Sequence, residues 1–269
     1  MAKSAWKKFP YSDKAYDYAG PALKKAWSAL HRGDCEPFPD EAWVKKAIEA
    51  HPKLDPKMPP AKAAEALQSA WRAYHAGDFA KAVELGLQAG LAGYNAANKA
   101  AMIYANYLED DDARKLVIFQ EIAARCEELQ AAEPENANAW YIQAYALGRY
   151  SQGISVAKAL AEGLGGKIKQ LLSRAIELAP KHADAHIALG TWHAEVIDKV
   201  GSLVGGLTYG AKKDAGADLL AKALKLNPDS AIARTEMANG LVMLFGKAKM
   251  KEAESLYAEA AAFEAADAM

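Results

Sequence analysis

Helical runs separated by prolines at nearly regular intervals are the feature of this sequence that most constrains its fold. The markers AAEPENANAW, ELAPKHADAH and KLNPDSAIAR contain Pro134, Pro180 and Pro228, which are 46 and 48 residues apart. Each marker follows an Ala- and Leu-rich run and precedes another helical pattern. A proline ends one helix, and an Asn, Asp or Ser after it can cap the next. The pattern therefore predicts one helical unit repeated along the chain.

A shift of 48 residues aligns the last two of these units without a gap. Gly153 then coincides with Gly201, and Leu172 coincides with Leu220. Such agreement indicates stacked helical hairpins, in which each hairpin contacts its neighbours. We interpret the chain as six hairpins with approximate limits 21–50, 60–93, 95–132, 137–179, 183–226 and 230–265.

One octet occurs twice, as WSALHRGD at 27–34 and as WRAYHAGD at 71–78. Two histidines in a repeated motif raise the question of an active site. Gly77 and Asp78, however, lie where a first helix would turn into a second, because Gly accepts a positive φ and Asp caps a helix. We expect Gly33 and Asp34 to do the same, and we interpret the octet as a structural repeat.

Composition favours a helical protein, and the length allows one long domain or two short ones. The 269 residues carry a formal charge of −1, so no basic excess points to nucleic acid. Cys35 and Cys126 form no CxxC pair, which favours a reduced, cytoplasmic setting. No stretch is apolar enough to span a membrane, although a removed leader stays open. We expect an arm at 1–20 packing on the first hairpin, a single solenoid domain at 21–265 and a proline-rich linker at 51–62.

The sequence resembles the tetratricopeptide repeat (TPR), whose first helix carries the pattern W-x2-L-G-x2-Y. ADAHIALGTWH matches it with Leu189 and Gly190 between His186 and His193, and ANAWYIQAYAL and AIARTEMANGL match it more loosely. Residues 135–245 also resemble the regulators of microtubule dynamics and the bacterial T-component proteins of TRAP transporters. The resemblance implies an all-α, right-handed superhelical solenoid that serves as an interaction module. Some members of these families are associated with lipid or other apolar ligands, but their membrane anchors and lipoprotein leaders have no counterpart here.

Candidate chemical sites are few. His182, His186 and His193 lie at spacings of four and seven, which could chelate a transition metal, but two of them fill the aromatic positions of the repeat. GLGGK at 163–167 fails the phosphate-loop pattern, and no GxSxG elbow is present. The acidic stretch LEDDDARK at 108–115 caps the following helix in our interpretation, with a cation or a basic partner as the alternative. We expect no catalytic residue, no metal and no cofactor.

Two inserts and one helix face carry the functional prediction. The excess length of hairpins four and five lies at 151–167 and 200–216, and the uncharged run from 200 to 211 should be covered by something. One side of the first helix of hairpin four presents polar and aromatic groups at intervals of three or four residues, which would line the inner wall of a solenoid. The predicted binding residues are Asn138, Tyr141, Tyr145, Arg149, Trp71, Tyr74, Tyr104, Tyr107, Leu203 and Tyr209.

We therefore expect a non-catalytic protein that recognises a protein or peptide partner in a concave groove. The alternative is a carrier of an apolar small molecule or lipid, held between the groove and the glycine-containing inserts. An enzyme ranks third, because the sequence shows no combination of nucleophile, base and oxyanion donors. The sequence leaves the oligomeric state and the identity of the partner open.

Overall fold

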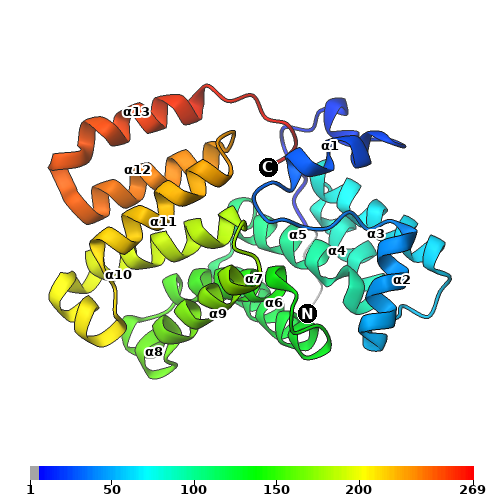
Figure 1. Cartoon of the computed structure of the whole chain (residues 1–269), viewed down its shortest axis with the longest axis horizontal. Helices are drawn as coiled ribbons and strands as arrows, with labels where there is room; N and C mark the ends of the chain where they lie inside the picture. Colours follow the sequence, from blue (N-terminus) through cyan, green and yellow to red (C-terminus); the bar gives the residue numbers. More distant parts are fainter. Residues whose placement is uncertain (1–5) are drawn as a thin grey trace. The chain divides into compact units, whose positions relative to one another are not determined.

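The computed structural model describes residues 6–269, and within them the only regular secondary structure is helical (Figure 1). The chain divides into two compact units. The first unit holds the residues up to Leu30, Glu36–Leu164 and Ala265–Met269, and the second holds His31–Cys35 and Gly165–Glu264. Whether they form the single expected domain stays a prediction.

The helices of the first unit are η1 (Lys14–Asp17), α1 (Ala22–Leu30), α2 (Glu41–Ala50), η2 (Pro52–Leu54), α3 (Pro60–His75), α4 (Phe79–Gln88), η3 (Gly90–Gly93), α5 (Tyr94–Tyr107), α6 (Asp112–Ala132), α7 (Ala137–Gln152) and α8 (Val156–Ala161). The helix α9 (Leu164–Leu178) begins at the boundary. The second unit continues with α10 (Ala183–Tyr209), α11 (Lys213–Leu226), α12 (Ala231–Phe245), η4 (Gly246–Lys249) and α13 (Met250–Ala261).

The three proline markers build the same local structure each time. Two residues after each proline, the side chain of Asn136, His182 or Ser230 accepts a hydrogen bond from the backbone N–H three positions on and caps α7, α10 or α12. Each cap satisfies one of the N–H groups that a helix leaves unpaired at its start. The repeat predicted from the prolines is therefore a repeat of helix N-termini.

A second contact at each marker explains which side chains occupy the tryptophan position of the W-x2-L-G-x2-Y pattern. Trp140 Nε1 donates to the carbonyl of Pro134 at 2.9 Å, and His186 Nε2 lies 3.0 Å from the carbonyl of Pro180. The Arg234 guanidinium donates to the carbonyl of Pro228 in the same way. Three different side chains thus tie a first helix to the turn before it, and His186 takes the place of a tryptophan.

Antiparallel helix pairs form the body of each unit. In the first unit α3 packs on α4 and α5 on α6, while the first helices α3, α5 and α7 lie next to one another in that order. In the second unit α10 packs on both α11 and α12, and α12 packs on α13. Because successive hairpins meet through their first helices, side chains on one side of α3, α5 and α7 share a surface.

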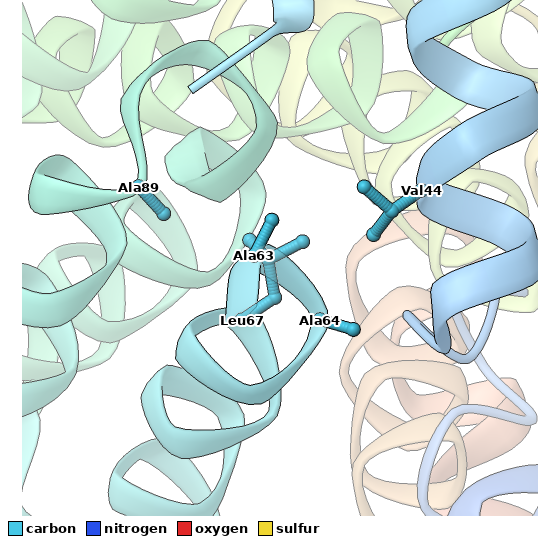
Figure 2. Close-up of a cluster of buried hydrophobic side chains, with 5 residues drawn as sticks. All are labelled: Val44, Ala63, Ala64, Leu67 and Ala89. Carbon is cyan, nitrogen blue, oxygen red and sulfur yellow. The ribbon is translucent and has the colours of Figure 1, made fainter. Parts of the chain in front are cut away.

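The predicted first hairpin is not a packed helix pair. The helix α2 packs on α3 instead, and a turn followed by an extended stretch separates α1 from α2. Two prolines, Pro37 and Pro39, prevent this stretch from becoming helical. The α2–α3 contact buries the cluster of Val44, Ala63, Ala64, Leu67 and Ala89, in which small alanines let the helices approach closely (Figure 2).

The predicted linker at 51–62 is ordered against the same unit. It contains η2, and Leu54 of η2 is buried against Leu129, Ala132 and Ala139. The proline-rich composition thus marks a tight connection between α2 and α3.

Both inserts are largely helical, which answers a question that the sequence left open. The first contains α8, with Gly163 at a φ of +64° before α9. The second continues α10 beyond a kink at Gly201, whose φ of +80° breaks the helical path, as far as Tyr209. Glycine is needed at both positions because other residues rarely adopt a positive φ.

The repeated octet proves structural, although its two copies differ. Gly77 has a φ of +80° and Asp78 caps α4, as predicted. The expectation for Gly33 and Asp34 was wrong, because Asp40 caps α2 in their place.

The two octet tryptophans, Trp27 and Trp71, pack edge to face with ring centroids 5.7 Å apart, and the His75 ring lies against both of them. These three rings therefore pack together in the core of the first unit.

The N-terminal arm packs on the second and third predicted hairpins, which corrects the expectation that it covers the first. Phe9 lies over the α3–α4 turn, where a Cβ on Gly77 would come within 2.5 Å of its ring. Trp6 stacks on Tyr104 of α5 with ring centroids 3.9 Å apart.

Candidate functional site

An extended segment of the chain's own backbone is bound to the first helices of the first unit. Residues 36–40, Glu-Pro-Phe-Pro-Asp, have no regular structure and are called the EPFPD segment below. The Glu36 carboxylate accepts hydrogen bonds from Asn138 Nδ2 at 2.6 Å and from Asn95 Nδ2 at 3.0 Å. Gln68 Nε2 donates to the carbonyl of Pro39 at 3.0 Å. The side of α3, α5 and α7 that carries Gln68, Asn95 and Asn138 is called the first-helix face.

The two asparagines occupy the same place in successive repeats. Asn95 is the second residue of α5 and Asn138 is the second residue of α7. Both are buried, and their amides converge on a carboxylate that is itself only 9% exposed. Amide N–H donors from two neighbouring helices satisfy buried acceptor oxygens, which would be costly to leave unpaired. The first-helix face is thus built to hold an acidic side chain.

The α1 helix holds the other side of the EPFPD segment. Trp27 Nε1 donates to the carbonyl of Glu36 at 2.7 Å, and its ring packs edge to face on Phe38 with centroids 5.1 Å apart. Lys24 lies over the Phe38 ring and pairs with Asp40 at 3.1 Å. The segment is therefore recognised through a carboxylate, an aromatic ring and main-chain carbonyls, which is how an extended peptide is usually read.

The α7 stripe predicted from the sequence continues from this carboxylate site. Tyr141 is buried and its ring lies 6.5 Å from that of Tyr145, while the Arg149 guanidinium stacks 5.0 Å from the Tyr145 ring. Tyr145 and Arg149 are half-buried. The structure thus brings Asn138, Tyr141, Tyr145 and Arg149 together as one row, and partner binding by this row stays a prediction.

Three other predicted binding residues belong to the core. Trp71, Tyr74 and Tyr104 are all at most 3% exposed. Trp71 packs on Trp27, Tyr74 packs on Trp71 and Phe79, and Tyr104 packs on Trp6. The prediction that they contact a partner was wrong, because their aromatic rings fill the interior. Tyr107 is 65% exposed at the end of α5 and is free to contact solvent.

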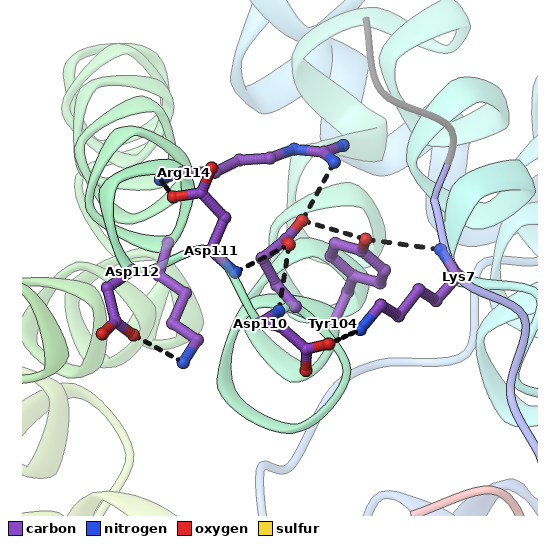
Figure 3. A network of polar contacts seen from close by, with 8 residues as sticks. Lys7, Tyr104, Asp110, Asp111, Asp112 and Arg114 are labelled. Atoms are coloured by element: carbon purple, nitrogen blue, oxygen red, sulfur yellow. Dashed lines mark hydrogen bonds and ion pairs between the residues drawn. The ribbon is translucent and has the colours of Figure 1, made fainter.

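The acidic stretch at 108–115 forms a polar network that includes the hydroxyl group of Tyr104 (Figure 3). The Glu109 carboxylate accepts from the Tyr104 hydroxyl at 3.0 Å and pairs with Arg114 at 3.0 Å. Burial alone would raise the pKa of the Glu109 carboxyl, but the Asp111 N–H, the Tyr104 hydroxyl and Arg114 hold that pKa below its usual range. The network also binds the N-terminal arm, since Lys7 pairs with Asp110. Lys7 of the same chain thus supplies a basic partner for this acidic stretch.

Asp111 performs the capping role that was predicted for this stretch. Its side chain accepts from the backbone N–H groups of Ala113 and Arg114 at the start of α6. Asp112 adds a negative charge in the first turn, where the helix dipole favours it.

Each histidine of the row makes a hydrogen bond within the second unit. The His182 side chain accepts from the Ala185 N–H at 3.1 Å as the cap of α10, and His186 contacts the Pro180 carbonyl. His193 Nδ1 accepts from the Lys212 N–H at 3.1 Å. Within residues 6–269 no group of three His, Cys, Asp or Glu side chains is arranged to hold a metal ion. The spacing of the row reflects its place in the repeat pattern.

Burial lowers the pKa of His186, and burial together with Lys169 and Lys212 lowers the pKa of His193 to about 4. A neutral His193 accepts the hydrogen bond that fixes the turn before α11.

The second insert presents an apolar surface that the second unit leaves uncovered. Leu203 is 76% exposed and Leu207 is 82% exposed, with Val204 between them in sequence, and Val200 is exposed just before the kink at Gly201. The chain itself does not cover these side chains, so cover by a ligand or by another subunit stays a prediction.

Tyr209 behaves differently from the leucines. A Cβ on Gly165 would come within 3.0 Å of its ring, and its carbonyl accepts from Lys169 Nζ at 3.0 Å. Gly165 belongs to the first insert, so the two inserts meet at this point. Tyr209 is thus an internal contact of the second unit.

Neither cysteine is an activated nucleophile. Cys126 is fully buried in α6, and burial raises the pKa of its thiol. Burial and Asp34 raise the pKa of the Cys35 thiol as well.

Among the described residues, no helix is both long and apolar enough to cross a membrane.

Sequence reasoning missed Glu36, Asn95 and Gln68. The signal was present in EPFPD itself, because two prolines around an aromatic residue favour an extended peptide. What the signal did not reveal was the surface on which the segment lies.

Comparison with known proteins agrees with this architecture. The family model described as "Regulator of microtubule dynamics protein 1-3" matches residues 66–199, a match that begins and ends earlier than the predicted resemblance at 135–245. No curated protein sequence matches the chain.

The solved structures that are similar to this chain include the following two. One is TTC0263, a thermophilic TPR protein of Thermus thermophilus, at 17% identity and a TM-score of 0.55, covering 74% of this chain and 89% of that chain. The other is the MamA protein, at 15% identity and a TM-score of 0.38 with the same coverage. The likeness to TTC0263 confirms the expected all-α, TPR-like fold, and the number of hairpins stays a prediction.

Proposed function

We propose that this chain, a TPR-like repeat protein that resembles the regulators of microtubule dynamics, is a non-catalytic binding protein that holds a protein or peptide partner on the first-helix face. The observation that supports this proposal most directly is the bound EPFPD segment. A surface that already holds one extended stretch of polypeptide has the donors and the shape to hold another.

The proposed mechanism is recognition without bond chemistry. Asn95 and Asn138 read an acidic group, and Tyr145 and Arg149 extend the surface along α7 with an aromatic ring and a carboxylate-binding fork. Because these side chains project from packed helices, little conformational entropy is lost when a partner binds.

The test is a pair of variants on α7 with a matched pair elsewhere. Tyr145→Ala with Arg149→Ala should abolish capture of the partner that the wild type retains. Lys251→Ala with Tyr257→Ala, which removes a cationic and a tyrosine side chain from α13, should leave capture unchanged. Circular dichroism and thermal melting establish that both variants fold. Equal capture by the two folded variants would contradict the proposal.

A second candidate function is supported by the exposed apolar side chains of the second insert. Leu203 and Leu207 on the helical segment after Gly201 could close over an apolar small molecule or a lipid. Native mass spectrometry of the purified protein, before and after organic extraction, tests this function. A bound lipid that Leu203→Ser with Leu207→Ser removes would support it, and an unliganded mass before extraction would contradict it.

A further inference from the structure

The EPFPD segment has the features of a resident ligand rather than of an ordinary interhelical loop. Side-chain amides from three helices donate to the Glu36 carboxylate and to the Pro39 carbonyl, whereas an ordinary connection would satisfy itself mostly within its own turn. The contacts span large distances in sequence, since Asn138 lies 102 positions from Glu36.

The fit of the segment to the first-helix face is incomplete. The Asn95 amide donates to Glu36 and to Asn136, but its buried carbonyl oxygen, Oδ1, has no partner among the described residues. An unpaired buried acceptor is unfavourable, so a ligand that supplies an N–H there would bind better.

Release of the segment would not separate a helix pair. The α1 and α2 helices on either side of it are not packed as a hairpin, and α2 is held by α3. Residues 36–39 can therefore leave the first-helix face while Asp40 stays as the cap of α2 and the α2–α3 cluster stays intact.

We propose that the EPFPD segment is an intramolecular competitor, and that the partner presents an extended segment of the same chemistry: an acidic residue, any residue, an aromatic residue and a proline. This inference rests on the proposed function and names the partner class for the same face. Asn95 and Asn138 read the acidic residue, Gln68 reads the carbonyl of the proline, and Trp27 packs on the aromatic ring.

The experiment uses a fluorescent synthetic peptide with the sequence of residues 34–42, in which Cys35→Ser removes the thiol. Its binding is measured by fluorescence anisotropy against the full-length chain and against the chain with Glu36→Ala and Phe38→Ala. Because the altered chain lacks both anchors of its own segment, it should bind the peptide at least about tenfold more tightly than the wild type.

Two controls test the specificity of the site. A peptide with Glu36→Gln should bind the altered chain several-fold more weakly, since the uncharged amide oxygen accepts weaker hydrogen bonds from the two asparagines than a carboxylate does. Adding Asn138→Ala to the altered chain should weaken binding of the original peptide by a similar factor. If the altered chain does not fold, Glu36→Gln in an otherwise wild-type chain provides the same comparison with a smaller gain.

The proposal is overturned if the folded altered chain binds the peptide no better than the wild type does, or binds the Gln peptide equally well. Such a result leaves the proposed function standing when partner capture still depends on Tyr145 and Arg149. If capture is also independent of those residues, both proposals fail.

Discussion

A methyl group added at Gly190 should destabilise the second unit. Gly190 lies in the interior of α10, where α10 approaches α11 closely. A Cβ at this position would come within 2.7 Å of Leu220 Cγ and 3.0 Å of the Gly216 carbonyl oxygen. Leu220 cannot move aside, because it is fully buried and its Cδ1 already fills the space beside Gly240 of α12, where a Cβ would overlap it.

Two opposing effects set the size of the change. Alanine is favoured over glycine inside a helix by about 1 kcal/mol, whereas forcing a methyl group into a well-packed core costs about 1–3 kcal/mol. Contact with a backbone oxygen and an immobile leucine puts this site at the upper end of that cost. We therefore expect Gly190→Ala to lower the free energy of unfolding by about 1–2 kcal/mol.

Urea unfolding followed by circular dichroism measures this change, and Gly148→Ala is the matched control. Gly148 lies inside α7, and a methyl group added there would have no atom within 4 Å, so alanine should stabilise by about 0.5–1 kcal/mol. In a Leu220→Ala background the cost of Gly190→Ala should shrink, because the nearest clashing side chain is gone. Equal stability of the Gly190 and Gly148 variants would refute the reasoning.

Three further predictions concern single residues. Burial and two nearby lysines lower the pKa of His193 to about 4. In the unfolded chain the same group binds its proton below about pH 6.5. The free energy of unfolding should therefore decrease as the pH falls from about 6.5 to about 4, by at most about 1.4 kcal/mol per pH unit. His193→Asn, which keeps an acceptor for Lys212, should flatten that slope in melts recorded from pH 7 to pH 4. Gly77→Ala should cost about 1–2 kcal/mol for its positive φ and should displace Phe9, so that limited proteolysis releases the N-terminal arm faster. Asp111→Ala should lower the free energy of unfolding by about 1 kcal/mol through loss of the α6 cap, and unchanged urea midpoints would contradict this.

The candidate site could be predicted from the sequence only along one helix. The α7 row follows from the 3.6-residue period, which predicts one face for Asn138, Tyr141, Tyr145 and Arg149 on the helix that the structure forms there. The same reasoning could not separate Trp71 and Tyr104 from a binding surface. An aromatic residue at helical spacing fits the core and the surface equally well until the neighbouring elements are placed.

The sequence by itself determined the local structure of this protein. Proline positions, the capping residues after them and the glycine at position 77 act through backbone groups a few residues away, so they hold wherever the helices pack.

Only the tertiary structure decided that Glu36 meets Asn95 and Asn138, that α1 and α2 do not pair and that Leu203 and Leu207 stay exposed. These outcomes depend on contacts between residues far apart in sequence. Such contacts form only when the packing of whole helices repays the entropy of closing long loops, and no local pattern records that balance.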